Sequence, residues 1–213
     1  RKMATLSVCF MSALTAVGIA IAPIWIRLLN PGWGEPAKAL CAWLAQVMFP
    51  FIMIVSLTAL VMGMLNAKRV FFVPAVASAF FNLGCIFGGL ALAWVMDPGF
   101  RAGKISETGL TAFAIGTLIG GLAQLSVQLP SLKRVGFRFG LDFGWKDEGV
   151  RKVLRLMWPS LIAAGGTQIN VLLNAIFASF THGKESAAAW LGNAQRLQQL
   201  PLGLFGVAVA TVT

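Results

Sequence analysis

The sequence predicts an all-helical, polytopic membrane protein, and three observations lead to this fold class. Hydrophobic residues make up 58% of the 213 residues and charged residues only 11%, whereas soluble domains carry about 25% charged residues. Long stretches of the chain contain no Asp, Glu, Lys or Arg. The charges gather instead in the short segments between these stretches, as expected of loops that lie outside a bilayer.

Six stretches are long enough to cross a bilayer as helices, which takes roughly 20 apolar residues each. Five of them are free of charge: residues 3–26, 39–67, 70–96, 108–132 and 156–181. The sixth, residues 186–213, contains a single charge, Arg196. The first stretch is too long for a signal peptide and is followed by others like it, so it is expected to be a membrane span.

The net charge of +10 is distributed unevenly between the two sides of the predicted membrane. Numbering the loops alternately places eleven basic residues on one side: Arg1, Lys2, Lys68, Arg69, Lys133, Arg134, Arg138, Lys146, Arg151, Lys152 and Arg155. The other side has five: Arg27, Lys38, Arg101, Lys104 and Lys184. The positive-inside rule makes the first side cytoplasmic, so we expect a multi-pass membrane protein with both ends of the chain in the cytoplasm. These basic residues flank membrane spans, so nucleic-acid binding is not expected.

No catalytic residue, metal site or cofactor is predicted from the sequence. Cys9, Cys41 and Cys85 lie in or beside apolar stretches without CxxC or Cys/His spacing, so we expect small buried residues. His182 is the single histidine and stands beside Gly183, which indicates a turn. Coupling of the protein to an ion or to the membrane potential is left open.

The long inner connection divides the chain into four helices in residues 1–132 and two in residues 156–213. Residues 133–155 between them are expected to be a cytoplasmic amphipathic linker at the anionic membrane surface. The residues that suggest this are Phe137, Arg138, Phe139, Phe143, Trp145 and Lys146.

Prolines and glycines suggest where the helices bend and where they pack. Pro50, Pro74, Pro159 and Pro201 are predicted hinges or kinks, because proline frees a backbone carbonyl and bends a helix. Small residues at close spacing let membrane helices approach each other. These are Gly84 with Gly88, Gly116 with Gly120, and Gly165 with Gly166.

Two polar helix faces form the candidate substrate-binding site. Thr167, Asn170 and Asn174 share one face of the fifth span, and Asn193, Arg196 and Gln199 share one face of the sixth. An arginine at membrane depth costs from ~3 to more than ~10 kcal/mol, so it is expected to face a cavity or a partner. A guanidinium suits bidentate recognition of phosphate. Two alternatives to a binding site remain. The amides could make polar contacts between helices, and Arg196 could extend its side chain to the outer interface, ~15 Å along the helix.

Three segments carry a resemblance to a known family. They are residues 49–66 with Pro74 and Asn82, residues 168–179, and residues 194–208. They resemble the MurJ (MviN) family of lipid II flippases, in the multidrug/oligosaccharidyl-lipid/polysaccharide exporter superfamily. The resemblance spans all 213 residues and corresponds to about the third through eighth of fourteen helices, so the chain is expected to be an internal fragment.

The resemblance implies a two-lobed transporter that moves lipid II, the undecaprenyl-pyrophosphate-linked peptidoglycan precursor, to the periplasmic leaflet by alternating access. Residues 1–132 would be the last four helices of the N-terminal lobe, and residues 156–213 the first two of the C-terminal lobe. The partners implied are lipid II and membrane lipids. The transport implied contributes to cell-wall organisation and cell shape. Arg196 matches the family's cavity arginine on the eighth helix, while Gln195 and Gln199 replace acidic residues that many relatives carry.

Other function classes remain as alternatives at this stage. A drug or polysaccharide-lipid exporter of the same superfamily would be expected to carry a cation-coupling carboxylate in a span, and the sequence shows none there. A membrane enzyme needs clustered acids or histidines, whereas those of this chain are scattered. A structural membrane protein would explain the helices but not the polar face that contains Arg196.

Overall fold

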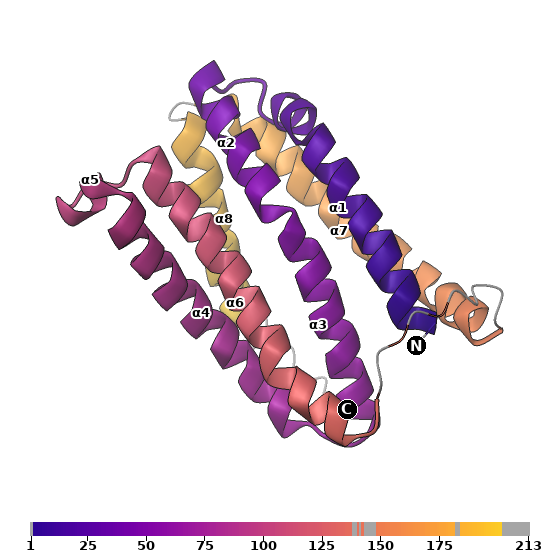
Figure 1. Ribbon diagram of the computed structural model, residues 1–213. Coiled ribbons are helices and arrows are strands. Elements are labelled where there is room, and N and C mark those ends of the chain that lie inside the picture. The colour runs from indigo at the N-terminus through magenta and orange to yellow at the C-terminus, as the bar shows by residue number, and fades with distance from the viewer. Residues whose placement is uncertain (1, 138–139, 141, 143–147, 182–183, 202–213) are drawn as a thin grey trace. The chain divides into compact units, whose positions relative to one another are not determined.

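The computed structural model describes residues 2–137, 140, 142, 148–181 and 184–201, and every regular element in this part of the chain is a helix. Figure 1 shows their order: α1 (Lys2–Leu29), α2 (Glu35–Met48), α3 (Pro50–Ala67), α4 (Phe72–Met96), α5 (Pro98–Arg101), α6 (Glu107–Arg134), α7 (Glu148–Ala178) and α8 (Lys184–Pro201). The all-helical fold class is therefore confirmed.

Five helical segments are long and apolar enough to cross a membrane. They are α1, the consecutive helices α2 and α3 taken together, α4, α6 and α7. These correspond to the five charge-free stretches of the sequence. The expected sixth span begins in α8, and residues 202–213 lie outside the described residues, so that span stays a prediction.

The chain forms two compact units, and the three boundaries between them fall inside helices. Unit 1 consists of residues 1–22 and 40–157, and unit 2 consists of residues 23–39 and 158–213. One boundary lies at Pro23 in α1, the second lies inside α2 after residue 39, and the third is next to Pro159 in α7. Residues 23–39 thus group with residues 158–213. The division into lobes at residues 133–155 stays a prediction. Arg138, Phe139, Phe143, Trp145 and Lys146 of the predicted linker lie outside the described residues, and residues 148–155 form the first turns of α7.

Glycines bring α4 and α6 into the closest helix contact of unit 1 (Figure 1). A Cβ added at Gly84 would lie 2.6 Å from the Cα of Gly120, and one added at Gly116 would lie 2.5 Å from the Cα of Gly89. Backbone therefore meets backbone at two levels of this pair. The packing predicted for the glycines at 84, 88, 116 and 120 is confirmed, whereas added Cβ atoms at Gly165 and Gly166 have no described neighbour within 4 Å.

Gly116→Ala is expected to lower the free energy of unfolding by about 1–3 kcal/mol, because the new methyl group collides with the backbone of α4. Gly63→Ala is the matched control: its Cβ has no described atom within 4 Å, so its effect should stay within about 0.5 kcal/mol. Chemical or thermal unfolding of the purified protein measures both. Equal stability of the two variants would contradict the backbone contact.

A side chain from α2 satisfies the carbonyl that Pro23 frees in α1. Pro23 has no N–H to donate to the carbonyl of Ile19, four residues before it. The Nε2 of Gln46 donates to that carbonyl oxygen at 3.0 Å. In a bilayer no water replaces a lost backbone hydrogen bond, so this contact allows a proline inside a spanning helix. The sequence analysis had not singled out Pro23.

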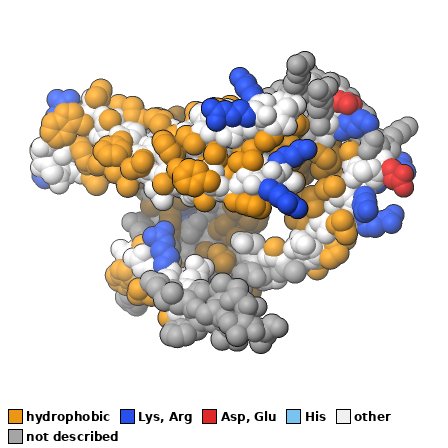
Figure 2. Space-filling model, turned by 90° about the horizontal axis from the view of Figure 1, so that it is seen from below, with side chains coloured by type: hydrophobic (Ala, Val, Ile, Leu, Met, Phe, Trp, Pro, Cys, Tyr) orange, Lys and Arg blue, Asp and Glu red, His pale blue; other side chains and the backbone are white. Residues whose placement is uncertain are grey.

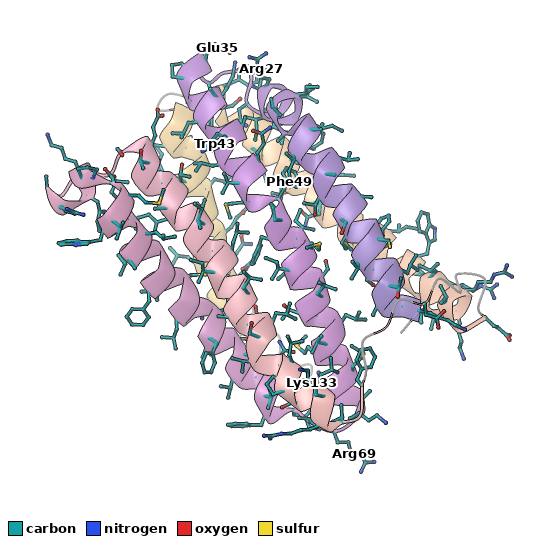
Figure 3. All side chains as sticks on the ribbon, in the orientation of Figure 1. Arg27, Glu35, Trp43, Phe49, Arg69 and Lys133 are labelled. Atoms are coloured by element: carbon teal, nitrogen blue, oxygen red, sulfur yellow. The ribbon has the colours of Figure 1, made fainter. Side chains whose placement is uncertain are left out.

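The four predicted hinge prolines occupy different positions in their helices. Pro159 is inside α7, and Pro201 is the last described residue of α8. Pro50 is the first residue of α3, where the second span divides into α2 and α3 beside Phe49 (Figure 3). Pro74 lies in the first turn of α4, where its missing N–H removes no helical hydrogen bond. Bending at these residues stays a prediction.

Gln46→Ala is expected to destabilise the protein by about 1 kcal/mol, because the Ile19 carbonyl loses its donor. In a Pro23→Ala background, the new N–H of residue 23 can take over that carbonyl, so the same substitution should cost less. A double-mutant cycle of unfolding free energies measures the difference. Strictly additive effects would show that Gln46 does not compensate for the proline.

Candidate polar site on α7 and α8

The polar residues predicted on α7 share one face of that helix. The Nδ2 of Asn174 donates to the Oδ1 of Asn170 at 2.7 Å, one helical turn away. Asn170 is exposed and Asn174 is half-buried. The two amides therefore form a hydrogen-bonded pair that still has donors and acceptors to offer to a ligand. Thr167 lies one turn earlier in the same helix.

The second set of predicted residues lies on α8. Asn193, Arg196 and Gln199 follow one another at intervals of three residues and are all exposed. Within the described part of the chain, no hydrogen bond or ion pair involves Arg196. Its guanidinium thus presents an uncompensated positive charge beside two amides, an arrangement suited to an anionic group.

The described parts of α7 and α8 do not form a packed helix pair. Among the described residues, no hydrogen bond joins the amides of Asn170 and Asn174 to Asn193, Arg196 or Gln199. Each set is thus held on its own helix, and a common cavity lined by both sets stays a prediction.

The loop between α1 and α2 packs against the end of α7, a contact that the sequence analysis missed. A Cβ on Gly32 would overlap the carbonyl oxygen of Ser179. Ser179 is 1% exposed, and its hydroxyl donates to the carbonyl of Ile176 at 2.7 Å. In the sequence, Pro31-Gly32 indicates a turn. The residue that Gly32 contacts, Ser179, is about 150 residues later in the chain, so only the fold reveals this contact.

Ionisable groups near two connections, that between α4 and α6 and that between α1 and α2, have structural partners. The carboxylate of Asp97, 2% exposed, accepts from the backbone N–H of Ser106 at 3.0 Å and of Gly99 at 2.9 Å. These bonds, that from Ser106 foremost, hold the pKa of Asp97 below its ordinary value. The Oε1 of Glu35 lies 3.2 Å from the Nζ of Lys38, and its Oε2 lies 3.6 Å from the Nη2 of Arg27.

Among the described residues, no group of three His, Cys, Asp or Glu side chains could hold a metal ion. The functional groups of the candidate residues Asn170, Asn174, Asn193, Arg196 and Gln199 are amides and one guanidinium. These groups bind and orient polar or anionic ligands, and they do not supply a nucleophile or a general base.

Helix lengths, composition and contacts define the class: a multi-pass, all-helical membrane protein whose polar site is suited to binding. A model of the lipid II flippase MurJ family matches residues 1–213. The chain belongs to the lipid II flippase MurJ family.

Individual relatives agree with the family match. A probable lipid II flippase MurJ of Vibrio cholerae serotype O1 is 34% identical over 221 residues, which cover 100% of this chain and 40% of that protein. One of Rhizobium tropici is 38% identical over 89% of this chain and 34% of its own length. The lipid II flippase MurJ of Burkholderia cenocepacia is 31% identical over 99% of this chain and 40% of its own length. The chain thus spans about two fifths of the length of the curated relatives it matches.

Cysteine labelling tests whether the two polar faces line water. In a variant lacking the native cysteines, Asn170→Cys, Asn174→Cys and Arg196→Cys are expected to react with a water-soluble maleimide, because a thiol reacts as the thiolate in water. Leu172→Cys is the control, since residue 172 lies on the opposite side of α7 at the same depth. Equal reactivity at position 172, or protection at position 196, would contradict a water-filled site.

Proposed function

We propose that the protein containing this chain moves a lipid-linked peptidoglycan precursor, lipid II, across the bacterial inner membrane. The observation that carries the proposal is the match of the MurJ family over all 213 residues. Relatives from several bacteria are described as lipid II flippases or probable lipid II flippases, and five spans of this chain support a multi-pass membrane location.

The chain is proposed to supply six helices of a fourteen-helix transporter with two lobes. Residues 1–132 would end the N-terminal lobe and residues 156–213 would begin the C-terminal lobe, with both ends of the chain in the cytoplasm. The eleven basic residues on one side of the membrane against five on the other support this orientation.

Arg196 is proposed to contact the pyrophosphate of the substrate. Two facts support this role: the guanidinium is exposed, and no described carboxylate neutralises it. Asn193 and Gln199 on the same helix, with Asn170 and Asn174 on α7, would hydrogen-bond neighbouring polar atoms of the headgroup.

Transport would proceed by alternating access and involve no covalent step. In such a cycle the site binds the headgroup both when it opens to the cytoplasm and when it opens to the periplasm. Amides and a guanidinium bind the headgroup in both states without a proton transfer. Two of the three unit boundaries lie beside Pro23 and Pro159, and they support bending within α1 and α7 during such a cycle.

Arg196→Ala in the full-length protein is expected to abolish growth of a flippase-depleted strain at unchanged protein level, because the pyrophosphate loses its cationic partner. Arg196→Lys should restore growth only in part, since an ammonium cannot bind phosphate in the bidentate manner. Gln198→Ala is the control, an exposed residue on the other side of α8. Normal growth with Arg196→Ala would remove the residue from the mechanism.

A further inference from the structure

An apolar pocket of about 490 Å³ lies between α1, α3 and α6 in unit 1. Val8 of α1, Leu60 and Met64 of α3, and Leu129 of α6 contribute to its lining. Thr5 is a polar residue of this lining, and its hydroxyl oxygen already accepts a hydrogen bond from the backbone N–H of Asp142 at 3.0 Å. The volume is typical of small-molecule sites, about 300–1,000 Å³, and the lining favours a hydrocarbon.

A second pocket, of about 350 Å³, adjoins the first at the ends of α3 and α6. Met64 and Phe137 line both pockets. The lining of the second pocket also includes Lys68, directly after α3, and Leu132, in the last turns of α6. The apolar space therefore ends at a cationic side chain.

Four basic residues stand where α3 and α6 end, and one of them, Lys68, lines the second pocket; the others are Arg69, Lys133 and Arg134. Figure 3 shows Arg69 and Lys133 together where α3 and α6 end. Figure 2, seen from below, shows Lys and Arg side chains beside hydrophobic ones. In the part of the chain that the structure describes, none of the four pairs with a carboxylate.

We propose that the two pockets hold an acyl chain of an anionic phospholipid, with its phosphate at Lys68 and Lys133. A hydrocarbon chain fits the apolar lining, and the cations at its end select a negative headgroup over a zwitterionic one. Basic pockets between membrane helices on the cytoplasmic side are suited to anionic headgroups. This site is in unit 1, on other helices than the polar residues of α7 and α8, and it does not depend on the proposed flippase activity.

Native mass spectrometry of the full-length protein tests this site, with phosphatidylglycerol and phosphatidylcholine of equal chain length as probes. The wild type is expected to bind one phosphatidylglycerol in preference to phosphatidylcholine. Lys68→Gln with Lys133→Gln should weaken phosphatidylglycerol binding about thirtyfold, from about 1 kcal/mol per basic residue near the headgroup, and leave phosphatidylcholine binding unchanged. Arg101→Gln with Lys104→Gln removes two charges from the connection between α4 and α6 and should change neither.

A second pair of variants tests the apolar pocket. Leu129→Trp fills it and should reduce the binding of both lipids, whereas Leu122→Trp on the exposed face of α6 should not. If Leu129→Trp leaves lipid binding intact in a folded protein, another segment of the full-length protein occupies the pocket and the proposal is wrong. Equal affinity for the two lipids, or full competition by soluble glycerol phosphate, would also overturn it.

Discussion

The absence of water in the bilayer core is the constraint on which the rest of this structure depends. A backbone carbonyl or N–H without a partner costs several kcal/mol there, so each departure from a regular helix needs a local donor or acceptor. The Nε2 of Gln46 meets the Ile19 carbonyl freed by Pro23. Where α4 ends, the carboxylate of Asp97 accepts from two backbone N–H groups of the following connection. Irregular backbone is thus found beside side chains that complete its hydrogen bonding.

The same constraint explains why glycine directs the packing of α4 and α6. Lipid tails are as apolar as leucine side chains, so membrane helices associate through close contact and not through removal of apolar surface from water. Gly84 and Gly89 of α4 meet Gly120 and Gly116 of α6 at backbone distance. By contrast, large side chains such as Phe87 and Trp94 remain exposed on α4, where lipid would solvate them.

The spans were predictable because a stretch of 24 or more residues without charge has few structures other than a membrane helix. The glycine pairs at 84–88 and 116–120 were predictable as packing positions because their spacing places them on one helix face. The hydrogen bond from Gln46 to the Ile19 carbonyl was not predictable, since it joins two different helices. The apolar pocket was hidden for the same reason: α1, α3 and α6 contribute to it from distant parts of the sequence. The two polar faces were predictable separately from their periodicity, but periodicity carries no information on whether α7 and α8 meet.

The backbone contact between α4 and α6 has a mechanical consequence. Helices separated by long side chains can slide, because those side chains change rotamer as they pass. Two backbones in contact lack that freedom, because Gly84 and Gly116 have no side chain and the facing backbone lies where a Cβ would be. We therefore expect α4 and α6 to move together as one rigid pair in a conformational change of the whole protein.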